Sequence, residues 1–323
     1  MKRKTIQAER LNTICWLSDD LVDWISGRVF YLATGEIKSL GRYYPFGADA
    51  AISSSDNQYT FVYQRLGTKG LLLKNGELVR EINRSYYFAE SYEYPAVFLT
   101  FNGVTYLAHC PKEYCRIDFE NAETGELITD VPGREPADTF HSRLESSPDG
   151  RYLMTKGWVW HPVDIAEVFN VADCLRNPLL LDKPMLSPDV SVEINSASFI
   201  NDSLVVIGSS DESFDDDRTD FPTKHIGIWN LSTDRITSKS KVNGEFGNLF
   251  AINERYTWDL FKYPKVIDIT TGEIVDKDDS VFSGEQNSSI INEGLPKIAY
   301  NRENKQIAIA HNNTLEILST DFR

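Results

Sequence analysis

Histidine, cysteine and carboxylate side chains are the groups in this chain that could do chemistry. The five histidines are dispersed along the sequence: His109, His141, His161, His225 and His311. None stands in a ligand spacing such as His-x-x-x-His, and the sequence contains neither a Gly-x-Ser-x-Gly nucleophile elbow nor a phosphate-cradling glycine-rich loop. We therefore predict a protein that is not an enzyme and carries no cofactor.

Half of a zinc site is suggested by His109 and Cys110, followed by Cys115. Zinc requires four ligands, usually with a second closely spaced pair, and the sequence offers no such pair. With Cys15 and Cys174 the chain has only four cysteines, too few for a disulfide framework in 323 residues. We expect reduced thiols and no bound metal.

A dense acidic run lies between residues 211 and 220. A calcium loop of the EF-hand type needs alternating ligands, a central glycine and a distal glutamate, and the run lacks this pattern. A solvated loop, an acidic docking site for a basic partner and a calcium site are the three interpretations, of which the solvated loop is favoured. As a secondary candidate site it comprises Asp211, Glu212, Asp215, Asp216, Asp217 and Asp220.

The net charge narrows the class of partner. The chain has 33 Lys and Arg against 48 Asp and Glu, a net charge of −15, so its average surface repels phosphate and anionic lipid. Nucleic-acid and membrane-surface roles are therefore disfavoured. The basic N-terminus is not followed by the apolar core of an export signal, and no stretch of about 18 apolar residues occurs. We expect a cytoplasmic, monomeric protein.

A repeated apolar segment with a small polar turn organises the chain. The clearest copies are Tyr31-Leu-Ala-Thr-Gly-Glu-Ile37 and Ile267-Asp-Ile-Thr-Thr-Gly-Glu-Ile274. Seven copies can be aligned, with a mean spacing of about 48 residues, which is typical of a four-stranded propeller blade. Their turns are marked by Gly35, Gly76, Gly125, Asp173, Asp234, Gly272 and Asp321.

A second series of seven turns alternates with the first. Its clearest member is Ser147-Pro-Asp-Gly-Arg-Tyr-Leu153, in which proline and glycine favour a tight hairpin turn. Two interleaved series of hairpins predict an all-β fold, a seven-bladed β-propeller of four-stranded antiparallel blades. Residues 1–323 then form a single domain.

These motifs resemble those of WD-repeat-like propeller proteins. Residues 147–153 resemble the turn between the first two strands of such a blade, and Ile226-Gly-Ile-Trp-Asn-Leu231 resembles a third strand. The Gly-His and Trp-Asp pairs of the strict WD pattern are missing, so the resemblance is to divergent members. It implies the fold and a protein-interaction role.

The last repeat ends after its third strand, which leaves one blade without an outer strand. Residues 4–11 precede the first blade and belong to no repeat. We predict that they pair with residues 315–319 and close the ring, which would cover an otherwise open sheet edge. A frayed N-terminus is the alternative.

The linkers between blades supply the candidate binding surface, because they are rich in tyrosine and arginine, the residue types that dominate binding hot spots. Packing between blades is the alternative role for the aromatic residues, and we assign the tryptophans to it. The predicted partner-binding residues are Arg42, Tyr43, Tyr44, Arg84, Tyr86, Tyr87, Tyr92, Tyr94, Arg134, His141 and Arg143.

Two functions of different classes fit these observations. The first is a non-enzymatic protein-binding propeller, most specifically an acidic immunity or antitoxin protein that sequesters a basic protein. The second is a propeller enzyme or small-ligand sensor with a site in the central channel, where Asp49, Glu90, His141 and Asn195 are the candidates. A carboxylate and a histidine in contact within a deep channel pocket would favour the second.

Overall fold

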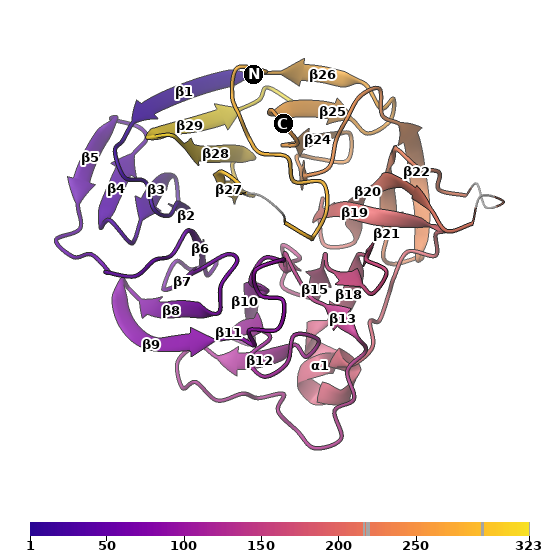
Figure 1. Ribbon diagram of the computed structural model, residues 1–323, viewed down its shortest axis with the longest axis horizontal. Coiled ribbons are helices and arrows are strands. Elements are labelled where there is room, and N and C mark those ends of the chain that lie inside the picture. The colour runs from indigo at the N-terminus through magenta and orange to yellow at the C-terminus, as the bar shows by residue number, and fades with distance from the viewer. Residues whose placement is uncertain (216, 218–219, 292–293, 323) are drawn as a thin grey trace.

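The computed structural model describes residues 1–215, 217, 220–291 and 294–322. Within these ranges the strands form eight antiparallel sheets, five of four strands and three of three strands. Figure 1 shows the sheets following one another around a common centre, so the fold is all-β and propeller-like.

The first three sheets follow chain order. The first contains β2 (Cys15–Leu17), β3 (Asp20–Asp23), β4 (Arg28–Tyr31) and β5 (Glu36–Ser39). The second contains β6 (Ala50–Ser53), β7 (Tyr59–Tyr63), β8 (Lys69–Lys74) and β9 (Glu77–Asn83). The third contains β10 (Ala96–Phe101), β11 (Val104–His109) and β12 (Asp118–Asn121), and an isolated bridge joins Glu120 to Leu127 at its edge.

The middle of the chain departs from this plan. One three-stranded sheet contains β14 (Glu145–Ser146), β15 (Tyr152–Thr155) and β18 (Glu167–Asn170). A second small sheet contains β13 (Thr139–Phe140), β16 (Trp158–Val159) and β17 (Val163–Asp164), built from the segments before β14 and between β15 and β18.

The last three sheets return to four strands each. They are β19 (Val192–Phe199), β20 (Leu204–Ser213), β21 (His225–Asn230) and β22 (Arg235–Lys241), then β23 (Leu249–Ala251), β24 (Tyr256–Asp259), β25 (Lys265–Asp268) and β26 (Ile274–Lys277). The final sheet has the order β1 (Lys2–Gln7), β29 (Thr314–Ser319), β28 (Gln306–His311) and β27 (Lys297–Asn301).

The predicted turns mostly lie where the repeats placed them. Residues 147–151 connect β14 to β15, and Gly150 there has φ +73°. The copy marked by Asp173 is the exception, because it forms α1 (Val171–Arg176) and η1 (Pro178–Leu181) instead of a tight hairpin. The Asn170 side chain caps α1 by accepting a hydrogen bond from the Asp173 amide, which favours the helix over the turn.

Apolar side chains fill the spaces between neighbouring sheets. Seven clusters are each shared by two sheets, and one of them joins the final sheet to the first through Leu21, Phe30, Ala308 and Leu315. The outer strands β5, β9, β22 and β26 are largely exposed and carry charged residues, which discourages edge-to-edge association.

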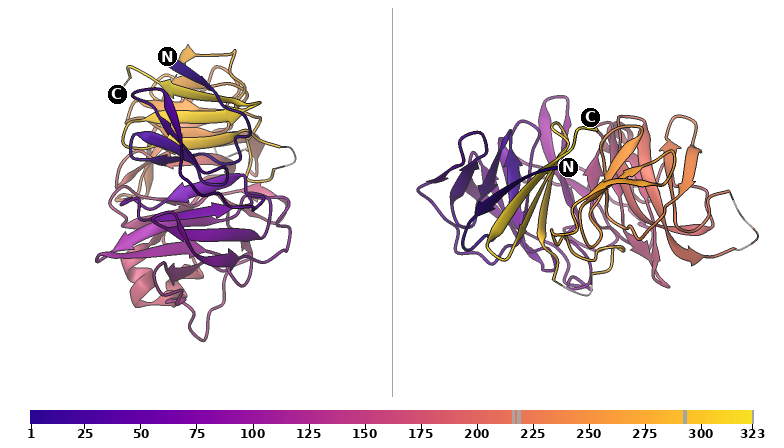
Figure 2. Two further views of the ribbon diagram at one scale, coloured as in Figure 1. Left: turned by 90° about the vertical axis from the view of Figure 1, so that its left-hand side faces the viewer. Right: turned by 90° about the horizontal axis from the view of Figure 1, so that it is seen from above.

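The N-terminal segment pairs with the C-terminal sheet. Six residue pairs join β1 to β29, from Lys2 opposite Ser319 to Gln7 opposite Thr314. The observed strand, Lys2–Gln7, begins two residues earlier than the predicted segment of residues 4–11. Arg3 makes a two-pronged ion pair with the buried Glu316, and Figure 2 shows the two termini close together.

Deletion of residues 1–7 should destabilise the protein strongly. It removes the β1 ladder, leaves Glu316 without its arginine and opens the edge of β29. We expect the midpoint of thermal unfolding, measured by circular dichroism, to fall by roughly 10 °C. Lys2→Gln, which removes only an exposed charge that pairs with Asp321, should leave the midpoint nearly unchanged. A deletion variant that unfolds at the same temperature as the wild-type protein would contradict the role of β1.

Candidate functional site

An exposed group of aromatic side chains is the most distinctive surface feature. Tyr86, Tyr87, Phe88 and Trp160, which we call the aromatic patch, are 85%, 42%, 39% and 42% exposed. Large apolar side chains that gather in this way on a surface mark interaction sites more often than single exposed ones do.

Two buried rings and the half-buried Tyr114 support the aromatic patch from below. Phe140 of β13 stacks on Trp158 of β16 at 3.9 Å and on Tyr114 at 4.3 Å, measured between ring centroids. Tyr87 stacks on Tyr114 at 4.9 Å, and Trp160 meets Phe140 edge to face at 5.2 Å. The small sheet that contains β13 and β16 thus acts as a rigid base for the patch.

Arg84 fixes the loop that carries three of the four patch residues. Its guanidinium donates hydrogen bonds to the carbonyl oxygens of Gly67, Ala89 and Tyr92, and it lies 4.5 Å from the Tyr92 ring centroid and 4.9 Å from that of Tyr94. Arg84, Tyr92 and Tyr94 are buried. The prediction that these three residues contact a partner is therefore corrected, because they hold the loop from within. Tyr86 and Tyr87 are the predicted residues of this loop that are exposed.

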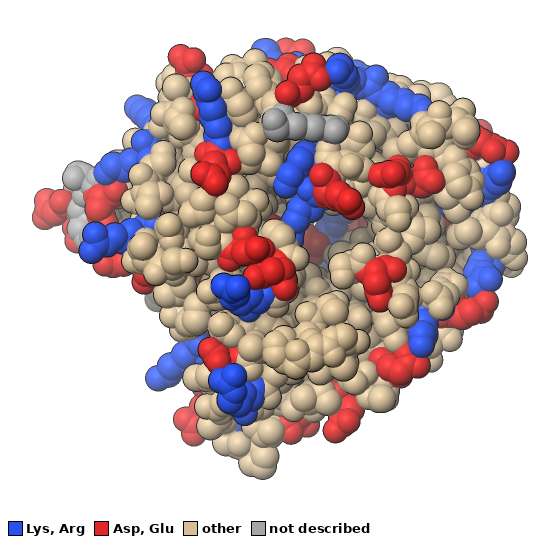
Figure 3. Space-filling view, turned by 180° about the vertical axis from the view of Figure 1, so that it is seen from behind, with Lys and Arg blue, Asp and Glu red and all other residues tan. Residues whose placement is uncertain are grey.

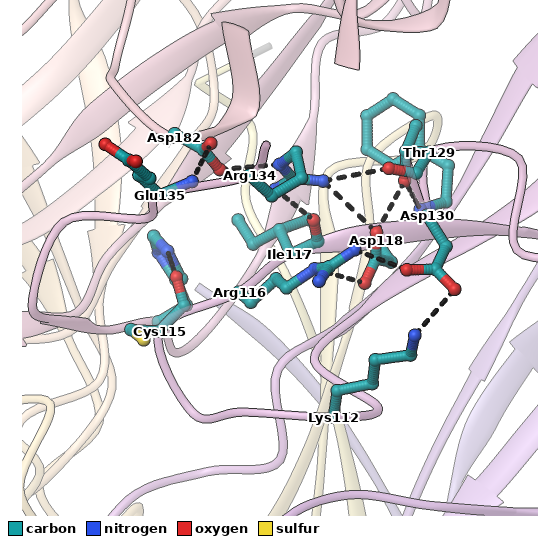
Figure 4. A network of polar contacts seen from close by, with 12 residues as sticks. Lys112, Cys115, Arg116, Ile117, Asp118, Thr129, Asp130, Arg134, Glu135 and Asp182 are labelled. Atoms are coloured by element: carbon teal, nitrogen blue, oxygen red, sulfur yellow. Dashed lines mark hydrogen bonds and ion pairs between the residues drawn. The ribbon is translucent and has the colours of Figure 1, made fainter. Parts of the chain in front are cut away.

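Arg134 is likewise a structural residue and does not reach a partner. Its side chain is only 1% exposed and pairs with Asp182 at 2.6 Å and Asp118 at 3.2 Å. It also donates to the carbonyl oxygens of Thr129 and Ile117. Figure 4 shows how these contacts tie the linker before β13 to the elements beside it.

The network around Arg134 extends to the surface. Arg116 pairs with Asp118 and Asp130, and Lys112 pairs with Asp130 at 2.6 Å. One connected set of ion pairs therefore extends from the fully buried Arg134 to the half-exposed Lys112 (Figure 4).

His141 is buried and was wrongly predicted to lie on the partner surface. Its Nε2 lies 3.2 Å from the Cys115 carbonyl oxygen and its Nδ1 lies 3.3 Å from the Thr155 hydroxyl. Burial lowers the pKa of His141 from 6.5 to about 4, with a smaller lowering by Arg134, so the ring is neutral at pH 7. Arg143 turns toward the centre of the molecule and donates to the carbonyl oxygens of Lys156 and Asn195.

The remaining predicted residues lie between β5 and β6. The Arg42 guanidinium donates to the Gly76 carbonyl and pairs with Glu77, and the Tyr44 hydroxyl donates to the same carbonyl. Tyr43 is 72% exposed. This linker braces the turn between β8 and β9 and does not join the aromatic patch.

The acidic run forms the end of β20 and part of the loop that follows. Asp211 lies 3.6 Å from Lys224, the Glu212 amide donates to Ser210, and the Asp217 amide donates to Asp215. Asp220 accepts a hydrogen bond from Lys239 through its carbonyl oxygen, and Asp216 lies outside the described residues. Among the described residues, no three His, Cys, Asp or Glu side chains gather in a way that could hold a metal ion.

The four residues suggested for a channel enzyme do not come together. Asp49 lines the central channel, Glu90 is exposed on the loop of the aromatic patch, and His141 and Asn195 are buried with different partners. A histidine–carboxylate contact does exist, because His109 Nε2 lies 3.0 Å from Glu120 Oε2. It is fully enclosed between β11 and β12 beside Arg80, away from the channel.

Sequence reasoning missed Phe88, Tyr114, Phe140 and Trp160 as parts of the candidate site. The tryptophans were assigned to packing between blades, which fits Trp229 and Trp258 but not the half-exposed Trp160. The alternation in Trp158-Val-Trp160 places both rings on one side of a short strand, and this was the available signal.

The comparisons with known proteins identify the fold but no family. No family model matches the sequence, and no curated protein is similar to it. Many chains of solved structures are similar, among them a chain of a structure titled "Crystal Structure of Mitotic Checkpoint Complex". It has a TM-score of 0.57 and 10% sequence identity, with 97% of this chain and 90% of that chain covered.

That likeness shows the propeller-like fold alone.

Among the described residues, no helix has the length and apolar character needed to span a membrane.

Replacement of Arg134 should destabilise the fold even though no partner is present. Arg134→Met leaves Asp182 and part of Asp118 buried without their arginine, so we expect the free energy of unfolding in urea to fall by roughly 3 to 5 kcal/mol. Lys112→Met, in the exposed part of the same network, should cost less than about 1 kcal/mol. Equal, small losses would contradict the structural role of Arg134.

His141 should make stability depend on pH. Because its folded pKa of about 4 lies below the ordinary 6.5, its contribution is complete above pH 6.5 and is lost as the pH falls toward 4. Between pH 7 and pH 5 we expect the wild-type protein to lose roughly 2 kcal/mol more stability than His141→Gln. Urea unfolding of both proteins at the two pH values measures this, and parallel losses would refute it.

Proposed function

We propose that this protein is a non-enzymatic, protein-binding propeller of seven blades in a single domain. The seven apolar clusters between neighbouring sheets support that number of blades. On this view β13, β16 and β17 are an addition to the fourth blade, and β1 supplies the outer strand of the seventh.

The aromatic patch is the observation that carries the proposed function. Tyrosine and tryptophan give large contact area with few rotatable bonds. Here the rings of Tyr87, Phe88 and Trp160 already pack on Phe140, Tyr114 and Trp158, while Tyr86 projects into solvent. A partner would therefore meet a surface that needs little further ordering, and less of the binding free energy would be lost on association.

Carboxylates around the aromatic patch indicate a basic partner. Glu90 lies on the same loop as Phe88, Glu113 precedes Tyr114, and Asp138 accepts a hydrogen bond from the Tyr114 hydroxyl. Lysine or arginine side chains of a partner would find aromatic faces and negative charge together. The net charge of −15 would also accelerate the approach of a basic protein.

Neutralisation of a basic toxin, as by an immunity protein or antitoxin, is the specific form of this function that we propose. It needs a basic partner whose own active surface is covered on binding.

Replacing the aromatic patch should abolish partner binding without unfolding the protein. We expect wild-type protein to capture a basic protein from native lysate, and Tyr86→Ser with Trp160→Ser to reduce the recovered amount by about tenfold or more. Quantitative mass spectrometry of the bound fraction measures this, and a rise in salt concentration should weaken binding.

Leu78→Ser is the matched control, because Leu78 is 53% exposed on the outer strand β9 and belongs to no aromatic cluster. It should capture the partner as the wild-type protein does. Recovery of the same protein by the double variant in equal amount, or binding that does not respond to salt, would count against the proposal.

A further inference from the structure

A cavity occupies the centre of the molecule. Its volume is about 180 Å³, and inner strands from several sheets line it, including β6, β19, β23 and β27. Below the range of about 300 to 1,000 Å³ typical of sites for drug-sized ligands, it has room for a ligand of only a few non-hydrogen atoms. The charged residues among its lining are Asp49, Arg65, Glu93, Arg143, Lys156 and Lys297.

Positive charge predominates in this cavity, in contrast to the protein as a whole. Four lysine or arginine side chains face two carboxylates in the lining, whereas the chain has a net charge of −15. Buried charges are normally paired, because an unpaired ion away from water costs several kcal/mol.

Arg143 has no ion pair within the described ranges. Its Nε donates to the Lys156 carbonyl oxygen at 3.2 Å and its Nη2 donates to the Asn195 carbonyl oxygen at 3.1 Å. Burial lowers the pKa of Arg143, although Asp164 and Glu93 act in the opposite direction. Its guanidinium is thus held in place by backbone oxygens with no carboxylate bound directly to it.

Lys156 shares a single carboxylate with another cation. Lys156 Nζ lies 2.7 Å from Glu145 Oε2, and Arg302 Nη2 lies 2.8 Å from Glu145 Oε1. The carboxylate also accepts hydrogen bonds from the Ser198 hydroxyl and the Phe199 amide. One negative charge therefore compensates two positive ones.

The other two cations also make no ion pair within the part of the chain that the structure describes. Lys297 has none. The Arg65 side chain donates to the Pro296 carbonyl oxygen at 3.2 Å while its Nε is buried without a partner, and its backbone amide donates to the Asp49 carboxylate. The Nε2 amide of Gln286, in the same lining, is also buried without an acceptor. The cavity thus offers hydrogen-bond donors that find no acceptor among the described residues.

Segments of the chain narrow the access to the cavity at both ends. On one side the linker between β26 and β27 reaches across the centre, where Ser289 donates to Asp164 and Ile290 bridges to Tyr92 (Figure 1). On the other side Arg302 extends to the Ser146 carbonyl and Glu145. Figure 3 shows this second face hollowed at its centre, with basic and acidic side chains around the hollow.

We propose that the central cavity binds a small oxyanion, a phosphate or a short dicarboxylate, through Arg143, Lys156, Arg65 and Lys297. An anion there would supply negative charge and accept hydrogen bonds from groups that have no acceptor among the described residues. Because these groups are partly buried, each interaction is stronger than it would be on the exposed surface. This site is independent of the aromatic patch and of protein binding.

Thermal unfolding in the presence of two anions tests the proposal. Sodium phosphate and sodium malonate are titrated separately at constant ionic strength, with sodium chloride as the reference. We expect a saturable rise in the unfolding midpoint with at least one of the two oxyanions. The relative half-saturating concentrations then distinguish a phosphate ligand from a dicarboxylate ligand.

Lys297→Gln should raise the half-saturating concentration by about threefold or more, because it removes one cavity cation that makes no ion pair with the described residues. Lys183→Gln makes the same change in charge at an exposed lysine outside the cavity and should leave the response unchanged. No saturable rise with either oxyanion, or equal weakening by the two variants, would overturn the proposal.

Discussion

The burial of apolar side chains between neighbouring sheets is the interaction on which the rest of the structure depends. Each sheet is too small to be stable alone, and its two apolar faces are both covered only when a sheet lies on either side. The pairing of β1 with β29 brings the first and last parts of the chain into that arrangement. The inner strands and the linkers are consequently held in fixed positions, which is what a rigid binding surface requires.

The linkers contain buried backbone carbonyl oxygens that need hydrogen-bond donors, and some of their side chains are used for this instead of for contact with a partner. Arg84 and Arg134 show how this is done, because each donates hydrogen bonds to several backbone carbonyl oxygens that no strand would otherwise reach. Arginine suits this role since its planar group presents five donors. The same residue type that marks binding hot spots is here used to stabilise loops, while Tyr86 and Tyr87 of the same linker remain on the surface.

The fold could be predicted from the sequence much further than the site could. Turn chemistry such as that of residues 147–153 is local, so it survives without knowledge of tertiary contacts. The helix α1 and the small sheet of β13, β16 and β17 were not foreseen, because they depend on a cap and on ring stacking between distant residues. Exposure of Tyr86 and burial of Tyr92 are likewise set by the path of the loop around Arg84, and residue type alone does not reveal it.

The two candidate sites place opposite demands on the fold. The aromatic patch exposes apolar area, which costs little stability because the rings of Tyr87, Phe88 and Trp160 keep contacts with Phe140, Tyr114 and Trp158. The central cavity instead gathers cations away from water, and desolvation lowers the pKa values of both Arg143 and Lys156. Hydrophobic residues of similar size would stabilise such a centre at least as well. Stability alone therefore does not explain why lysine and arginine line the cavity, whereas the binding of an anion that neutralises them does.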